Sequence, residues 1–170
     1  LETTIAPEKL RADVDYTYKN LQKLHPNLYW YISKESLDKK FDSLKTTINK
    51  PLNPSDFFEK LAPVISDIRE GHLALRVPSK RLTRKEIKNL ENQKGLFSRM
   101  NYVVQDNRIF VKDNAEKFEN IAVGTEILQI QDIPVSVYLE RYEPYVNSDG
   151  FNTTFQPYSM ARRWPGYFTV

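Results

Sequence analysis

In the first part of the chain, hydrophobic positions recur at spacings of three and four, the period of an amphipathic α-helix. The pattern predicts a helix that begins near Pro7 and ends at His25, because Pro26 cannot continue the helical hydrogen bonds. Second and third helices are predicted after Ser33 and Asn53, whose side chains can cap a helix. The expected apolar faces are Leu10, Val14, Tyr18, Leu21 and Leu24, then Leu37, Phe41, Leu44 and Ile48, then Phe57, Phe58, Leu61, Ile65 and Ile68.

The connection between the first two helices, residues 28–32, is rich in aromatic side chains. We interpret its aromatic run, residues 28–31, as core packing rather than a ligand platform, because such side chains bury a large apolar area. Pro63 is predicted to kink the third helix, and Gly71 to end it in a left-handed conformation. Residues 73–77 then alternate between apolar and polar, which predicts a strand and places His72 at a helix-to-strand junction.

The second half of the chain has mostly a period of two. Strands are predicted over residues 102–105 and 108–112, joined by a turn at 106–107 whose residues tolerate positive φ. A further strand is predicted over residues 124–130, closed by Pro134. A helix should follow, with Val137, Leu139, Tyr142 and Tyr145 on it.

These elements together predict an α+β protein. We expect an N-terminal helical, bundle-like domain over residues 1–78, a basic connector helix over residues 79–94, and a small mixed α/β domain over residues 95–170. Residues 147–150 are predicted to form a loop in the last of these, and the twenty residues that follow give no clear period.

Composition places the chain among globular proteins. Forty per cent of its 170 residues are hydrophobic, and 10 Tyr and 9 Phe supply large side chains for a core. The chain has no cysteine, which excludes disulfides, thiol nucleophiles and iron–sulfur sites. It has no apolar run of about 18 residues, so we expect no transmembrane segment.

The charged residues are interspersed along most of the chain, with one exception. The net charge is +3, but the connector, residues 79–94, holds six bases and two acids. Thr83 and Glu86 form a capping box that should begin its helix, and Gly95 can end it. A nucleic-acid or acidic-lipid patch is one interpretation, and an ordinary exposed helix face is the other. We favour the second and expect no nucleic-acid partner.

Few residues of the chain are candidates for a catalytic role. The two histidines are His25 and His72, and the chain has no Gly-x-Ser-x-Gly elbow. We expect His25 to bind the last carbonyls of the first helix, where the dipole favours it. Asp67, Glu70 and Asp149 could orient His72, but their spacing is not that of a metal site, and we expect no metal or cofactor.

Three segments, taken in order, carry a resemblance: LHPNLYWYISKESLDKKFDSL, FFEKLAPVISDIREGHLAL and VGTEILQIQDIPV. Together they resemble the N-terminal part of carboxyl-terminal-processing serine peptidases, the tail-specific and tricorn-core-like enzymes. Many members have a helical domain that ends in an Asp-Gly-His-Thr-like tetrapeptide, here residues 70–73. A PDZ-like domain with a Gly-Asp-x-Ile-x-x-Ile-x-Gly motif follows, which here begins at Gly124 and has Asp132 in place of the last glycine.

The resemblance implies a function. It makes the second domain PDZ-like and the chain a regulatory and substrate-gating part of a serine peptidase that acts on peptides or proteins. His72 would be the general base for a serine in a later α/β domain that lies outside this chain, or a lysine of that domain would take this role. An extracytoplasmic location, in the periplasm or cell envelope, is also implied, and a start at Leu1 fits removal of an export signal, although a remnant of an expression vector would begin in the same way.

Two alternatives remain open. His72 can be a partly buried structural histidine, the more common use of this residue. The chain can also be a stand-alone PDZ-like module that binds an extended peptide by strand addition, without enzymatic activity. A reading frame that continues for a further domain beyond Val170 favours the enzyme, and a stop codon there favours the binding module. Neither the substrate nor the oligomeric state is predicted.

Overall fold

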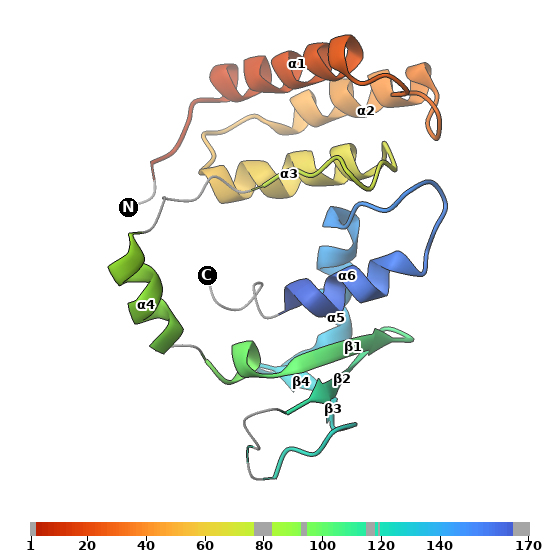
Figure 1. Cartoon of the computed structure of the whole chain (residues 1–170). Helices are drawn as coiled ribbons and strands as arrows, with labels where there is room; N and C mark the ends of the chain where they lie inside the picture. The colour runs from red at the N-terminus through yellow and green to blue at the C-terminus, as the bar shows by residue number, and fades with distance from the viewer. Residues whose placement is uncertain (1–2, 77–82, 93–94, 115–117, 119, 165–170) are drawn as a thin grey trace. The chain divides into compact units, whose positions relative to one another are not determined.

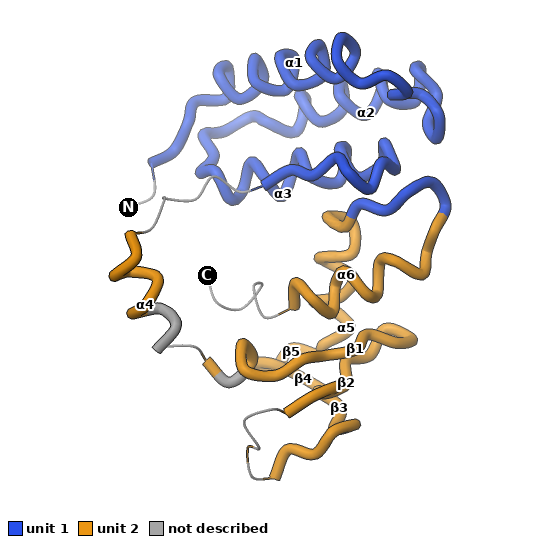
Figure 2. The backbone as a smooth tube through the Cα atoms, viewed as in Figure 1, with its two compact units in different colours: residues 1–79, 147–151 blue, residues 80–146, 152–170 orange. Residues whose placement is uncertain are grey.

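The protein forms two compact units. The computed structural model describes residues 3–76, 83–92, 95–114, 118 and 120–164. Unit 1 consists of Leu1–Ser79 and Asn147–Phe151, and unit 2 of Lys80–Val146 and Asn152–Val170 (Figure 2). Helices and small antiparallel sheets occur together, which confirms the predicted α+β class. In the described part of the chain, no helix is long and apolar enough to cross a membrane, as expected.

Unit 1 is built on three helices, α1 (Pro7–Leu24), α2 (Lys34–Thr47) and α3 (Pro54–Ser66), shown in Figure 1. Both predicted caps are confirmed. The Ser33 hydroxyl accepts a hydrogen bond from the Ser36 amide, and the Asn53 side chain accepts one from the Asp56 amide. These side chains satisfy amide groups that a helix start leaves without an intrahelical partner.

The core of unit 1 lies between these helices, since α1 packs on α2 and α2 on α3. The rings of Tyr18 and Phe41 stack between α1 and α2. The buried core residues are Leu10, Val14, Leu28, Leu37, Phe41, Leu44, Ile48, Leu52, Leu61, Ile65 and Ile68, most of which the helical pattern predicted. Apolar burial on this scale is the main term that holds three helices together.

The end of α3 differs from the prediction. Pro63 lies inside the helix as predicted, but the residue with positive φ after the helix is Arg69, at 59°, not Gly71. Residues 73–76 form no strand, although their exposure alternates as an extended segment's does. Val77 lies outside the described residues. His72 therefore lies in the loop after α3, and the described residues that follow it form no strand.

The aromatic connection between α1 and α2 was also predicted wrongly. Leu28 is buried in the core, but Tyr29, Trp30 and Tyr31 are exposed, and 71% of Trp30 is open to solvent. The residue types alone could not distinguish a buried aromatic run from an exposed one, because aromatic side chains serve both in cores and at binding surfaces. Of the four side chains from Leu28 to Tyr31, only Leu28 is buried in the core as predicted.

Unit 2 begins with the basic helix α4 (Arg84–Asn92), whose capping box is confirmed by hydrogen bonds in both directions between Thr83 and Glu86. A short 3-10 helix, η1 (Leu96–Arg99), leads to the hairpin of β1 (Asn101–Gln105) and β2 (Arg108–Asp113). Asp106 and Asn107 have φ values of 50° and 57°, which confirms the predicted two-residue turn.

The single strand predicted over residues 124–130 is divided into two. β3 (Glu126–Ile127) pairs with β2, whereas β4 (Gln129–Ile130) forms a separate hairpin with β5 (Ile133–Pro134). The change of partner falls at Leu128, which is exposed. The predicted helix then follows as α5 (Val135–Tyr142), with Tyr145 in the 3-10 helix η2 (Glu143–Tyr145).

The segment without a clear period contains a helix, α6 (Phe155–Arg163), which packs against β1. Trp164, directly after it, is fully buried, and its ring meets Tyr138 edge to face. The core of unit 2 consists of Met100, Tyr102, Ile109, Val111, Val135, Leu139, Val146, Met160 and Trp164. Helix α6 and the sheet thus share one core.

Candidate functional site

His72, the residue on which the functional hypothesis depends, lies in a solvent-exposed loop after α3. Its amide donates to the Glu70 carboxylate at 3.2 Å, and the Leu73 amide donates to the Glu70 carbonyl at 3.1 Å. The loop is thus closed by its own hydrogen bonds. No described residue forms a hydrogen bond with the His72 imidazole, so the ring is open to an external partner.

A second segment of unit 1, Asn147–Phe151, lies against this loop and forms two hydrogen bonds with it, one through a side chain and one between main chains. The Gly71 amide donates to Asp149 Oδ1 at 2.7 Å, and the Gly150 amide donates to the Arg69 carbonyl at 2.9 Å. We call residues 147–151 the clasp. Arg69 and Gly71, on either side of Glu70, are therefore held by a segment that is distant in sequence.

Gly71 and Gly150 each lie so close to another side chain that there is no room for a Cβ atom. A Cβ added at Gly71 would lie 2.8 Å from Asp149 Oδ1. A Cβ added at Gly150 would lie 2.9 Å from the ring of Tyr31, and the φ of Gly150 is 58°, a conformation that other residues rarely adopt. Gly71 is thus explained by close approach and not by the left-handed helix end that the sequence suggested.

Aromatic side chains surround the clasp on the outside. The Arg69 guanidinium lies 4.3 Å from the centre of the Phe151 ring, which in turn meets Tyr31 edge to face at 6.1 Å. Trp30 packs on Tyr31 in the same edge-to-face manner. Trp30 and Phe151 remain about as exposed as each other, at 71% and 72%. The pattern along the chain did not predict this surface, because its members come from three separate segments.

Glu70 connects the two histidines of the chain. While one of its carboxylate oxygens accepts from the His72 amide, the other lies 3.9 Å from His25 Nε2. The His25 amide caps α1 by donating to the Leu21 carbonyl, but its buried Nδ1 has no hydrogen-bond partner among the described residues. The prediction that the His25 ring binds the helix carbonyls is therefore wrong.

The three carboxylates suggested as partners of His72 have other contacts. Asp67 forms a 2.6 Å ion pair with Lys40, while Glu70 and Asp149 accept hydrogen bonds from backbone amides. Across the described residues, no cluster of three His, Cys, Asp or Glu side chains could hold a metal ion. The acids of this region thus shape the loop that carries His72 and leave its ring uncovered.

A mostly apolar hollow of about 420 Å³ lies beside this loop in unit 1. It is lined by the C-terminal half of α1, by His25 and by Leu73, the residue after His72. Leu24 and Tyr16, on its rim, are largely exposed. Its size and lining are suited to an apolar side chain.

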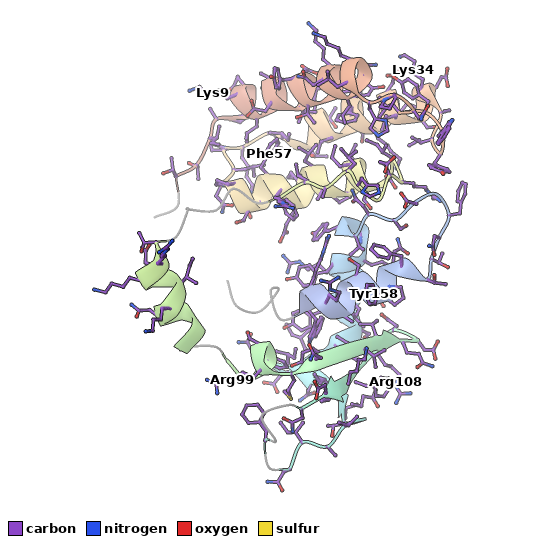
Figure 3. The ribbon with its side chains drawn as sticks, viewed as in Figure 1. Lys9, Lys34, Phe57, Arg99, Arg108 and Tyr158 are labelled. Atoms are coloured by element: carbon purple, nitrogen blue, oxygen red, sulfur yellow. The ribbon has the colours of Figure 1, made fainter. Side chains whose placement is uncertain are left out.

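Unit 2 contains a second groove, of about 450 Å³, along β1 and α6. It is lined by four consecutive β1 residues, 101–104, and by residues of α6 that include Tyr158 and Arg162. Figure 3 labels Tyr158 on α6. Of the described strands, only β2 pairs with β1, which leaves β1 at the edge of its sheet. The groove is thus lined by an edge strand and by charged side chains, among them Arg162, Lys112 and Asp113.

A scan of the sequence against protein-family models finds no matching family, and a search of curated proteins finds no matching relative. The functional proposal therefore depends on the geometry of these residues and on the resemblance carried by the three sequence segments.

Proposed function

We propose that this chain is the N-terminal, regulatory part of an extracytoplasmic serine peptidase, in which His72 acts as the general base for a serine of another domain. The observation that carries the proposal is the exposed imidazole of His72 on a loop whose backbone is held by Glu70 and Asp149. A general base needs a fixed direction and free access to the group that it deprotonates. Hydrogen bonds hold the backbone of the loop that carries His72, and the exposed ring leaves the imidazole accessible, which supports this role.

The chemistry assigned to His72 is that of acyl transfer. The imidazole, in its neutral form, takes the serine hydroxyl proton while the serine oxygen bonds to the peptide carbonyl carbon. The same proton then passes to the leaving nitrogen as the carbon–nitrogen bond breaks, and water later releases the acyl group by the reverse proton path. Leu73, the residue after this histidine, lines the apolar hollow. The hollow is suited to an apolar side chain of the substrate.

The reading frame of the source gene provides the first test. Continuation beyond Val170 into a further domain with a serine supports the proposal, and a stop codon at that position contradicts it. The second test uses the complete gene product. His72→Gln should lower kcat for hydrolysis of an unfolded protein by about 100-fold to 10,000-fold, the usual range for loss of a general base.

Arg76→Gln is the matched control for that experiment, because Arg76 is exposed and lies four positions from His72 on the same segment. It should leave kcat within about twofold of the unchanged protein, as expected of a surface substitution. Hydrolysis that survives His72→Gln at full rate would assign the base to another residue, such as a lysine of the later domain.

We propose peptide capture by unit 2 as the second candidate function, in agreement with a PDZ-like assignment. The observation in its favour is the groove along β1 and α6, which is lined by an edge strand and by Arg162. An extended peptide could pair with β1 and direct a carboxylate toward Arg162. The test is a titration of the chain with a peptide that has a free C-terminal carboxylate and with the same peptide amidated at its C-terminus. Equal affinity for the two peptides would exclude a carboxylate site.

A further inference from the structure

Asp149 has a specific connection to the loop that carries His72. It accepts the amide hydrogen bond of Gly71 at 2.7 Å, and the next residue of the clasp, Gly150, donates its amide to Arg69 on the other side of Glu70. Two hydrogen bonds in opposite directions thus fix the clasp against residues 69–71. The side chain of Phe151 adds its contacts with Arg69 and Tyr31.

The loop needs such a support because of its own sequence. Helix α3 ends at Ser66, so the amides that follow depend on turn hydrogen bonds and on side chains for partners. Gly71 has no Cβ and samples a wide range of backbone angles unless a contact restricts it. Since Gly71 directly precedes His72, any freedom in its backbone is passed on to the direction of the imidazole.

We propose that Asp149 is a positioning residue for His72, and that residues 147–151 hold the histidine loop in the conformation that presents its ring to solvent. The carboxylate does this through the Gly71 amide, and among the described residues it forms no hydrogen bond with the His72 ring. The inference rests on the proposed function for its catalytic consequence, but the clasp itself can be measured on this chain alone.

The first experiment measures hydrogen exchange of the Gly71 amide by NMR in the chain of 170 residues. Asp149→Ala should accelerate that exchange by roughly tenfold, the effect of losing one hydrogen bond to a charged acceptor. Asp149→Asn should exchange nearly as slowly as the unchanged chain, because a carboxamide oxygen can accept the same bond. Asp13→Ala, at an exposed position on α1, is the control for removal of an acid and should have no effect.

Phe151→Ala tests the clasp without touching the hydrogen-bonded carboxylate. It removes the ring that packs on Arg69 and Tyr31, and it should also accelerate Gly71 exchange. Unchanged Gly71 exchange in both Asp149→Ala and Phe151→Ala would overturn the inference. An Asp149→Asn variant that exchanges as fast as Asp149→Ala would overturn it as well, because the hydrogen bond would then not be the cause.

The second experiment uses the complete gene product and separates the inference from the proposed function. Asp149→Ala should lower kcat by about tenfold to 100-fold, as expected for a misplaced catalytic group, with KM unchanged, and Asp149→Asn should restore it. If His72→Gln abolishes hydrolysis and Asp149→Ala does not affect it, the inference fails and the proposed function stands. If Gly71 exchange responds and the protein has no peptidase activity, the clasp stands and the proposed function fails.

Discussion

The rings of Tyr18 and Phe41 stack with their centroids 4.2 Å apart and their planes 12° from parallel. The Tyr18 hydroxyl, at the edge of this stack, donates to Asp38 Oδ1 at 2.6 Å, and Lys34 reaches the other oxygen of the same carboxylate. One carboxylate on α2 therefore collects a donor from α1 and one from its own helix. The stack and the hydrogen bond act on the same pair of helices.

Tyr18→Phe should separate the two contributions. The substitution keeps the ring on Phe41 and removes the hydroxyl that binds Asp38, so the free energy of unfolding should fall by about 1 to 2 kcal/mol. Urea unfolding followed by circular dichroism measures this change. Tyr16→Phe, on an exposed side chain of the same helix, should change the stability by less than about 0.5 kcal/mol. Equal effects of the two substitutions would mean that the Tyr18 hydroxyl does not contribute.

Stability should fall in alkaline solution because of buried phenols. Burial raises the pKa of Tyr102 to about 12. The pKa of Tyr18 is also raised, mainly by burial and secondly by its hydrogen bond to Asp38. Above about pH 10 these phenols ionise in the unfolded chain but stay protonated in the folded one, so the free energy of unfolding decreases as the pH rises from about 10 to 12.

The measurement is urea unfolding at about pH 8 and about pH 11, on either side of the ordinary tyrosine pKa. Tyr102→Phe should lose part of the decrease between these values, since it has no phenol to ionise. Tyr158→Phe should retain it, because Tyr158 is more than half exposed. A Tyr102→Phe variant with the full decrease would assign the alkaline loss to other groups.

Three glycines form a graded test of the clasp. Gly150 has a φ of 58° and a Cβ position blocked by Tyr31, Gly124 has a φ of 88° and open space around it, and Gly95 has open space and no positive φ. Gly124→Ala should cost about 1 to 2 kcal/mol from the left-handed backbone alone, and Gly150→Ala should cost more. Gly95→Ala should stay within about 0.5 kcal/mol. Thermal unfolding of the three variants gives the order, and equal losses for Gly124 and Gly150 would show that the Tyr31 contact yields without strain.

The elements that the sequence predicted correctly are those that depend on neighbouring residues. The caps at Ser33 and Asn53 and the turn at Asp106 and Asn107 are local hydrogen-bond patterns, and each is present. The sequence did not predict helix α6, because the helix has only nine residues and some of them are aromatic. Its packing on β1 determines its conformation.

The candidate site shows the same division. The direction of the loop at His72 depends on Asp149, a residue 78 positions from Gly71 to which no periodicity connects it. The sequence signals at this contact were the two glycines, Gly71 and Gly150. Glycine occurs for many other reasons, so these two residues did not indicate that their segments meet. The hydrogen bonds of Gly71 with Asp149 and of Gly150 with Arg69 join distant segments, which local sequence patterns do not encode.

The helix caps provide the last prediction, and they test the local part of the fold. Ser33→Ala and Asn53→Ala each remove a side-chain oxygen that accepts an amide hydrogen bond at a helix start, at 3.1 Å and 2.8 Å. Each substitution should lower the free energy of unfolding by about 1 kcal/mol. Ser43→Ala is the matched control, since Ser43 lies exposed in the middle of α2, and it should leave the stability equal or slightly higher because alanine favours a helix. Chemical unfolding measures all three, and a loss at Ser43 as large as the loss at Ser33 would mean that capping does not account for the effect.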